Sequence, residues 1–524
     1  MKRVNPVKII LAAAIAILSC SAFASDTIPA PAGYGKFELL QVILPWTGTS
    51  NPGSLFEYNM PKTGLIQAGY SHDNSKIRLV QQPETASSYN AATKGYMKVG
   101  DLSLFGSFSY SNSRFNGSEY NGTLIFNSRN PYLLGDTVPA MQVREQFDME
   151  GVVSYPLSDR LALGVSATYV SAVGAKQKDP RNKNNISALN ITPGIIYNMG
   201  KTKVGLSGSW YSTSNEISYS VEGNWNQTLF MLLGLGYYRQ EVNISSYSQW
   251  YKGDGYSGAL QVSHENNGLF MLAELKYDHF KEEARNGSSF RLIDGITGTD
   301  DFSLQGLLRL ARGRALHFFE LDASVMTVSS DEILQRSYTV NKGTYSYDSL
   351  ATVSWIENKH MVTDIKGALN YSLLVFDDNH NLDFKAGGSV AANYFSTDHY
   401  PVQSYGYYNV LNLEATLFAG KLLHLGKMNF TPEIDLTYRA NLASDISYVT
   451  QTYSLPEMVY HDFYINKANI FGGAISLKLE KQLDQGKVIK SLFLIPEARI
   501  ALAPGTEAGD LSGYMVSAVA GIIF

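Results

Sequence analysis

The amino-acid sequence predicts an all-β fold: a transmembrane antiparallel up-and-down β-barrel of about 18 strands. Three observations support this prediction. Strand-length segments alternate between apolar and small or polar side chains from residue 63 to the end, short turns alternate with long polar stretches, and the final segment stops on an aromatic residue. Alternation of period two is typical of a strand with one apolar face. A tyrosine-rich soluble sandwich is the alternative fold.

The last segment, Tyr514 to Phe524, shows the alternation most clearly. Its apolar set is Tyr514, Val516, Ala518, Ala520, Ile522 and Phe524, whereas the intervening positions include Gly513, Ser517 and Gly521. A terminal aromatic residue on an alternating strand resembles the signal by which the outer-membrane assembly machinery recognises its clients. Tyr514 and Phe524 are therefore the predicted assembly signal, and the assembly machinery and outer-membrane lipid are predicted partners.

Composition agrees with a membrane barrel. The 34 Tyr and 24 Phe beside 17% charged residues suit aromatic girdles at two membrane interfaces. After the N-terminus no apolar run reaches the roughly 18 residues of a spanning helix, so a membrane crossing would have to use strands. The net charge of −5 gives no basic surface for nucleic acid. No Pro/Ser-rich linker or charge block divides the chain.

Residues 1–24 read as a signal peptide. Lys2, Arg3 and Lys8 precede an apolar run, and Ala22-Phe23-Ala24 offers a cleavage site before Ser25. The alternative is lipidation of Cys20, for which the preceding residues form a poor lipoprotein box. Cleavage after Ala24 would leave a mature chain without cysteine, and hence without disulfides.

Residues 25–62 are rich in Pro and Gly and show little alternation. They contain Pro45-Trp46 and the turn Asn51-Pro52-Gly53, and we interpret them as a periplasmic leader or a hatch-like segment. Alternation begins at Gly64–Tyr70, so the barrel is predicted to span residues 63–524.

Short turns and long polar stretches follow one another along the barrel. Pairing each turn with two strands gives about 18 strands, or 14 or 16 if some pairs belong to loops. The segments Gln227–Gln240 and Tyr345–Trp355 are strand-like or helix-like, and would either add a pair or fold over the barrel mouth. The turns are predicted at Gly100-Asp101, Pro156–Asp159, Asn198–Lys203, Asn266–Gly268, Arg312–Arg314, Asp377–Asn381, Gly420–Lys427 and Gln482–Lys487, and the long stretches at 114–141, 173–185, 214–253, 284–300, 329–358 and 443–463.

The segment from Met428 to Arg439 predicts which side chains face the lumen. A charge on the lipid side costs about 2–4 kcal/mol at mid-membrane, so its charged positions must point inward. They form either a network of ion pairs that packs the interior or a polar path for a solute. The same parity gives the full set of candidate lumen-facing charges: Arg144, Asp148, Glu150, Glu274, Lys276, Glu320, Asp322, Asp364, Lys366, Asp383, Lys385, Glu433, Asp435, Arg439, Glu497 and Arg499.

The sequence carries no motif of a known hydrolase, P-loop or metal enzyme, so we predict no catalytic residue, cofactor or metal site. Three Asp–His neighbours are expected near the outer rim, where barrel proteases keep such pairs: Asp278-His279, Asp398-His399 and His461-Asp462. Adjacent strand residues point to opposite faces, so adjacency alone does not predict a catalytic pair.

The mature chain resembles an uncharacterised family of Bacteroidota outer-membrane β-barrels, classed as a domain of unknown function. The features that carry the resemblance are the leader from Pro45 to Gly53, the Pro-Glu pairs at Pro432-Glu433 and Pro496-Glu497, and Phe524. Asn51-Pro52-Gly53 is also similar to the Asn-Pro-Ala of the long-chain fatty-acid transporter superfamily, in which it belongs to an N-terminal hatch; this chain has Gly53 instead of Ala.

The resemblance implies an outer-membrane location and a barrel, and no substrate. Two function classes therefore remain open. The first is a passive, porin-like channel or transporter, and the second is a structural or docking barrel whose extracellular loops bind a surface or periplasmic protein partner. No enzymatic activity is expected.

Overall fold

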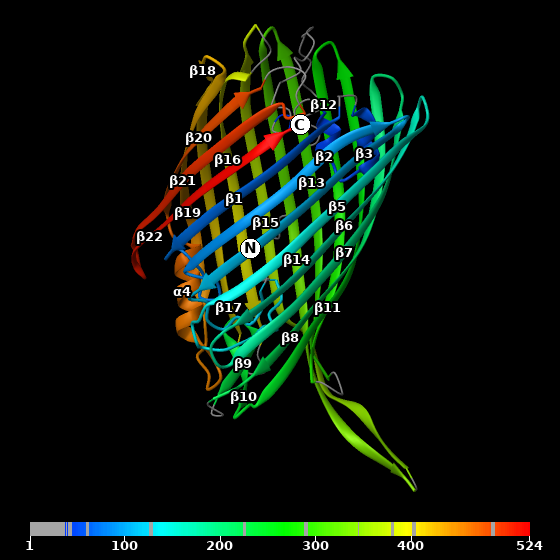
Figure 1. The fold of residues 1–524 in the computed structure, drawn as a ribbon. Coiled ribbons are helices and arrows are strands. Elements are labelled where there is room, and N and C mark those ends of the chain that lie inside the picture. Colours follow the sequence, from blue (N-terminus) through cyan, green and yellow to red (C-terminus); the bar gives the residue numbers. More distant parts are fainter. Residues whose placement is uncertain are drawn as a thin grey trace.

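The computed structural model describes residue 37, residue 39 and residues 44–58 and 62–524, with gaps at 125–128, 224–226, 288–291, 344, 379–381, 401–404 and 484–487. The predicted signal peptide lies outside these residues. The chain forms one closed antiparallel barrel (Figure 1). Its strands are β1 (Thr63–Ser75), β2 (Thr85–Val99), β3 (Leu102–Asn116), β5 (Gln142–Ser158), β6 (Leu161–Lys176), β7 (Arg181–Asn198), β8 (Thr202–Ser220), β11 (Ser246–Asn266), β12 (Leu269–Asn286), β13 (Leu292–Arg312), β14 (Ala315–Lys342), β15 (Tyr345–Phe376), β16 (Leu382–His399), β17 (Gly406–Lys421), β18 (Leu423–Leu425), β19 (Met428–Ser447), β20 (Ile470–Gln482), β21 (Ser491–Thr506) and β22 (Gly509–Ile523).

The predicted strand number is confirmed. The sheet has 19 strands, but β18 continues β17 along the same partner, β19, so 18 strands surround the lumen. Barrel strands are longer than predicted, because the polar stretches 173–185, 214–253, 284–300 and 329–358 are partly strand rather than loop. Strands β14 and β15, with 28 and 32 residues, project beyond the barrel as a two-stranded ribbon (Figure 1). The segment Tyr345–Trp355 thus extends β15 and adds no pair of its own.

The first and last strands close the barrel, as the terminal alternation predicts. β1 pairs with β22 from Leu65↔Ile523 to Ser75↔Gly513. Phe524 then exchanges two backbone hydrogen bonds with Gly64, at 2.9 and 3.0 Å. A Cβ on Gly64 would lie 2.4 Å from the Phe524 ring, so the ring packs directly on this glycine. Closure leaves neither strand with a free edge.

The predicted turns that the structure describes lie at one end of the barrel, which we call the short-turn end; the opposite end is the loop end. Residues 379–381 and 484–487 of two further predicted turns lie outside the described residues. Asn267 and Gly268 have φ of 49° and 77°, the left-handed geometry of a type I′ hairpin turn. This turn places β11 and β12 in a register that continues to Gln249↔Asn286. The short-turn end is at the top of Figure 1, where the C-terminus also lies.

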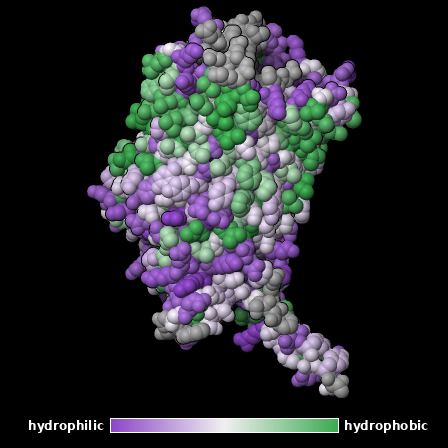
Figure 2. All heavy atoms as spheres, in the orientation of Figure 1, coloured by the Kyte–Doolittle hydropathy of each residue, from purple (hydrophilic) through white to green (hydrophobic). Residues whose placement is uncertain are grey.

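The outer surface carries an apolar band. Side chains such as Leu206, Leu417 and Leu436 are about 60% exposed, at 58%, 66% and 57%. On the face shown in Figure 2, hydrophobic residues gather over the upper half of the barrel, and hydrophilic residues cover the lower part and the ribbon. An outward apolar band with polar inward positions is the pattern of a barrel in lipid. Among the described residues, no helix has the length and apolarity for a membrane crossing.

The loop end is covered by a structure that we call the cap: the small sheet of β4 (Leu134–Gly135), β9 (Thr228–Gly234) and β10 (Tyr237–Val242), together with helix α4 (Pro456–Asn466). The segment Gln227–Gln240 therefore folds over the mouth, which is one of the two predicted alternatives. The helix was not predicted from the polar stretch 443–463. Its hydrophobic residues do not form the wide apolar stripe that signals a surface helix in sequence, and Met458, Val459, Phe463 and Ile465 are buried.

Candidate functional site

Residues 44–58, the continuous part of the leader that the structure describes, lie inside the lumen near the short-turn end and form two short 3₁₀ helices, η1 (Pro45–Gly48) and η2 (Pro52–Glu57). Asn51, between them, is 1% exposed. Its amide nitrogen donates to the carbonyls of Ile195 and Leu206 at 3.0 and 3.2 Å and to Gln261 Oε1 at 3.0 Å. Its Oδ1 accepts from the Gly53 backbone at 2.9 Å and so starts η2. One side chain thereby fixes the leader to β7, β8 and β11.

Two further contacts hold the leader against the wall. The buried Trp46 donates from Nε1 to Ser263 Oγ at 3.0 Å. The Ser50 backbone and hydroxyl both donate to Glu274 at 2.9 Å. The wall has glycines where the leader approaches: a Cβ on Gly164 would lie 2.3 Å from the Gly53 nitrogen, and one on Gly194 would lie 2.2 Å from Asn51 Oδ1. The wall is therefore built to accept the leader closely.

Three cavities form a series along the wall made by β12–β17 and β19. The cap cavity, about 290 Å³, lies beneath α4 and the turn between β9 and β10. The middle cavity, about 550 Å³, shares Asn393, Asn412 and Arg439 with it. The leader cavity, about 310 Å³, shares Gln305 and Asp322 with the middle cavity and is bounded by Pro45, Gly48 and Thr49 of the leader. Neighbouring cavities share lining residues, so they lie side by side from the cap to the leader, and we call this series of cavities the route.

The cap is attached to the barrel by buried polar contacts. In the small sheet, Arg239 forms an ion pair with Asp294 of β13, which is 4% exposed. Tyr237 stacks on the buried His399 with ring centroids 4.8 Å apart. Lys176, 2% exposed, pairs with Asp136 in the segment that leads away from β4, at 2.5 Å. A buried pair is costly to break by removing one partner, so these contacts fix the cap in place.

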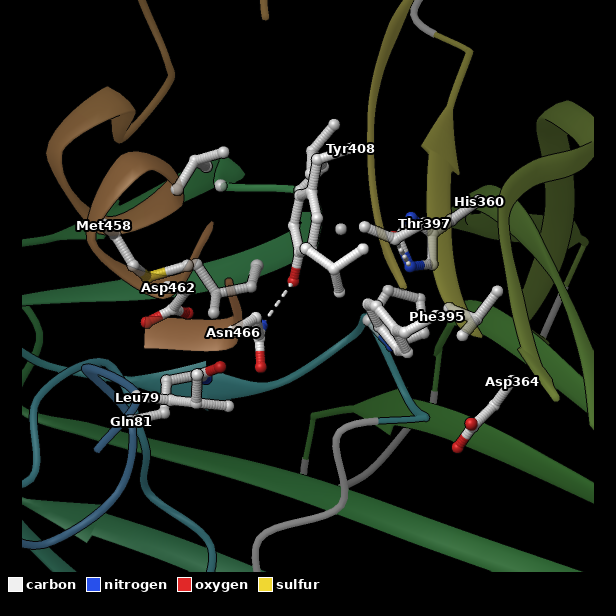
Figure 3. A pocket seen from close by; sticks show the side chains of 18 of the residues that line it. Leu79, Gln81, His360, Asp364, Phe395, Thr397, Tyr408, Met458, Asp462 and Asn466 are labelled. Carbon is white, nitrogen blue, oxygen red and sulfur yellow. Dashed lines mark hydrogen bonds between the residues drawn. The ribbon is translucent and has the colours of Figure 1, made fainter. Parts of the chain in front are cut away.

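Helix α4 is attached to the segment after β1 through the carboxyl group of Asp462, whose burial disfavours the charged form. Asp462 accepts a hydrogen bond from the Val80 backbone at 2.9 Å, and the neighbouring His461 contacts the Arg78 carbonyl at 3.0 Å. Burial raises the pKa of Asp462 to about 7, while the Val80 hydrogen bond and the Arg78 charge oppose the shift. Asp462 also lines the cap cavity (Figure 3).

This pKa predicts pH-dependent attachment of α4. In an unfolded segment the carboxyl titrates near 3.9, so between about pH 4 and 7 the attached state binds more protons, and attachment weakens as pH rises, by up to about 1.4 kcal/mol per pH unit. We expect limited proteolysis of residues 448–469 to accelerate severalfold from pH 5 to pH 8. The Asp462→Asn variant should show little pH dependence, and an equal pH dependence of both proteins would contradict the assignment.

The structure brings six of the candidate charges to the linked cavities: Glu274, Glu320, Asp322, Asp364, Lys366 and Arg439. Asp364 pairs with Lys366 at 2.8 Å. The Arg439 guanidinium donates to the carbonyls of Ile465 and Ala468 at 2.9 and 3.2 Å, and so connects the C-terminal end of α4 to the wall. The remaining candidates lie elsewhere.

Asp148 and Glu150 line a separate cavity of about 240 Å³ on the opposite wall, where Ser109 donates to Asp148 at 2.9 Å. Asp435 and Arg499 line another of about 480 Å³. The others are described by their contacts: Lys385 pairs with Glu433 at 2.8 Å, Asp383 with Lys421 at 2.7 Å, Lys276 with Asp278 at 3.9 Å and Glu497 with Arg499, and Arg144 donates to the Leu124 carbonyl at 3.1 Å.

The contacts of the Asp–His neighbours join each side chain to other residues and not to its sequence neighbour. In the first, His279 contacts Asp300 at 2.8 Å while Asp278 accepts from Tyr211 at 2.6 Å. In the second, His399 stacks on Tyr237, and Asp398 accepts from Tyr405. Within the described part of the chain, no group of three or more His, Cys, Asp or Glu could hold a metal ion.

Comparison with known proteins assigns the family. A model of DUF6850, a family of unknown function, matches residues 53–520. The chain belongs to this family. A search of curated proteins found no match.

Solved structures with a similar barrel include the RagAB peptide importer in the closed-closed state (8% identity, 89% of this chain and 87% of that chain, TM-score 0.39). They also include the FrpB iron transporter from Neisseria meningitidis, F3-3 variant (10%, 91% and 83%, TM-score 0.38), and the copper transporter OprC (8%, 87% and 81%, TM-score 0.37). Similarity of this degree transfers no substrate or mechanism to this DUF6850 member.

Of the residues that build the cap cavity and receive the leader, sequence reasoning found Asp364, Arg439 and Glu274 and missed most others. The small even-numbered positions of β6, including Gly164, were visible as a polar face but do not say what packs on them. His360, Asn393 and Thr397 lie on inward positions of β15 and β16 without a charge to mark them. These residues come together only because strands and cap segments that are far apart in the sequence pack against one another.

Proposed function

We propose that this DUF6850 member is an outer-membrane channel or transporter that passes small solutes passively along the three linked cavities. The observation that carries the proposal is their shared lining: Asn393, Asn412 and Arg439 join the cap cavity to the middle one, and Gln305 and Asp322 join the middle one to the leader cavity. A polar route along a barrel wall, closed at both ends by parts of the same chain, suits gated passage better than a solid structural interior.

The location is part of this proposal. The outward apolar band and the closed barrel support membrane insertion, and the signal peptide read in residues 1–24 supports export to the periplasm. The protein would then have outer-membrane lipid around it and the barrel assembly machinery as a transient partner. The short-turn end would face the periplasm, and the cap and ribbon the cell exterior.

The leader would form the periplasmic constriction, as the hatch-like resemblance of Asn51-Pro52-Gly53 implies. Asn51→Ala removes three hydrogen bonds to the wall, those that Asn51 donates to the carbonyls of Ile195 and Leu206 and to Gln261. We expect this variant to pass a small neutral solute into liposomes at least severalfold faster than the wild type. The measurement is liposome swelling with purified, heat-modifiable protein.

The matched control is Thr416→Ala, which removes one hydrogen bond of 3.0 Å to Thr437 in the wall away from the leader. Its flux should equal that of the wild type. If the wild type, Asn51→Ala and a variant lacking residues 44–58 all show no flux above empty liposomes, the lumen is not a route and the proposal fails.

The ribbon of β14 and β15 favours a second candidate, a docking barrel that binds a surface protein. Tyr338, Tyr345 and Tyr347 are 49%, 61% and 43% exposed on it. Cross-strand pairing of Lys342 with Tyr345 and of Val340 with Tyr347 places these side chains on one face, with Tyr338. Removal of residues 335–352 would abolish docking but leave flux unchanged, which separates the two functions.

A further inference from the structure

The cap cavity contains acceptor atoms that the protein leaves unused. Asp364 Oδ1, Asn393 Oδ1 and His360 Nδ1 are buried and have no hydrogen-bond partner among the described residues. His360 is only 5% exposed. With the proton on Nε2, which lies 3.5 Å from Thr397 Oγ1, its Nδ1 is an acceptor. Buried polar atoms without partners are uncommon, so these three indicate a missing donor.

Strand register brings Asp364 and Asn393 together on the wall, whereas His360 lies farther along β15, about 13 Å from Asp364 by strand rise. Asp364 is opposite Phe395, and Lys366 is opposite Asn393, so Asp364 and Asn393 are diagonal neighbours on the inner face. Figure 3 shows His360, Phe395 and Asp364 on one side and Met458, Asp462 and Asn466 of α4 on the other. The cavity thus has polar groups from both the wall and the cap.

Apolar and aromatic residues make up much of the remaining lining, beside polar residues such as Gln81, Asn130 and Arg439. Val362, Phe395 and Val410 come from the strands, and Met458 and Val459 from α4. Such a lining with a few convergent polar groups is typical of a binding site for a small organic ligand. Aromatic rings such as Phe395 also attract cations over their faces.

The route that leaves this cavity is acidic. Among the described residues that line the three cavities, the Lys and Arg side chains are Lys366 and Arg439. Lys366 is already paired with Asp364. The acidic residues farther along are Asp301, Asp322, Glu414, Glu274 and Glu320. Asp301 Oδ1 is another buried atom without a partner among the described residues. Fixed negative charge in a narrow lumen favours positively charged solutes.

We propose that the cap cavity binds organic ammonium ions, in which a charged amine carries a small apolar body. The ammonium group donates to Asp364 and Asn393, and the apolar part packs on Phe395 and Met458. The proposal rests on the proposed function in one respect: it names the class of solute that would enter the route. Binding itself requires only the cavity.

Binding of n-butylammonium to the purified full chain in detergent, measured by isothermal titration calorimetry at pH 7.5, tests this assignment. n-Butanol and pentanoate carry the same butyl chain without the positive charge. We expect saturable one-site binding of the ammonium ion, and at least tenfold weaker binding of the other two. Equal binding of butanol, or no binding of the ammonium ion at millimolar concentration, would overturn the proposal.

Two variants locate the site. Asp364→Asn removes the carboxylate and leaves Lys366 unpaired beside the ligand, and Asn393→Leu removes one acceptor at similar size. Both should weaken ammonium binding tenfold or more. The matched control Asp148→Asn changes a lumen carboxylate on the opposite wall and should bind as the wild type does.

Heat-modifiable migration on a gel shows that each variant is folded before it is titrated. If Asp148→Asn weakens ammonium binding as much as Asp364→Asn does, overall lumen charge and not this cavity holds the ion. Ammonium binding without flux in liposomes would refute the channel and leave the site intact. Flux without ammonium binding would refute the binding site and leave the channel intact.

Discussion

Deletion of Gly521 to Phe524 will remove folded protein from the outer membrane. The deleted residues supply the pairs of Leu65 with Ile523 and of Ile66 with Ile522, and both hydrogen bonds between Gly64 and Phe524. Each unsatisfied backbone group in lipid costs several kcal/mol, so an unclosed edge is not tolerated there. The deletion also removes Phe524, one of the two residues of the predicted assembly signal. We expect degradation in the periplasm and at least a tenfold lower outer-membrane amount on an immunoblot.

The matched control deletes residues 341–346 at the tip of the ribbon, which lies outside the barrel wall. This deletion should leave the amount and the heat-modifiable migration unchanged. Wild-type amounts of folded protein after deletion of Gly521 to Phe524 would show that closure of β1 on β22 is dispensable.

Leu436→Arg will impair insertion far more than Thr437→Arg. Leu436 points outward and is 57% exposed, whereas Thr437 lines a lumen cavity and contacts Thr416 at 3.0 Å. An arginine on the lipid face costs about 2–4 kcal/mol at mid-membrane, a large part of a typical folding free energy. In the lumen, the new guanidinium meets polar neighbours such as Asp435.

The measurement is the fraction of each purified variant that folds into liposomes, read from heat-modifiable migration. We expect Leu436→Arg to fold at least severalfold less than the wild type, and Thr437→Arg to fold within twofold of it. Equal impairment by both substitutions would mean that the two faces of β19 are assigned incorrectly.

The barrel itself follows from the sequence because its physical causes are local. Alternation assigns each residue of β19 to one face, and Asn267-Gly268 specifies a tight turn without reference to the rest of the chain. Strand ends were less well predicted. Polar residues of β14 and β15 pair with one another beyond the barrel, where no apolar alternation is required.

The site was predictable only in part. Parity drew attention to Asp322, Asp364 and Arg439, but it did not separate them from Asp148 and Glu150 on the opposite wall, because all have the same local pattern. The charges that share the cap cavity are those that the folded chain brings close to β15, β16 and α4 in space. The sequence set residues 25–62 apart from the barrel as a periplasmic leader or a hatch-like segment, whereas the position of Asn51 on three strands depends on wall glycines far away in sequence.

Blocking the route by chemical modification tests the central claim most directly. Cys20, the only cysteine of the chain, lies in the predicted signal peptide, so a single engineered thiol can be modified selectively in the mature protein. Ser324 lines the middle cavity, and Ser109 lines the separate cavity on the opposite wall. Each residue is replaced by cysteine in the Asn51→Ala background, and liposome flux is measured before and after treatment with a bulky methanethiosulfonate reagent. The account predicts that modification reduces flux severalfold in Ser324→Cys and hardly at all in Ser109→Cys; an equal reduction in both, or none in Ser324→Cys after complete labelling, would contradict it.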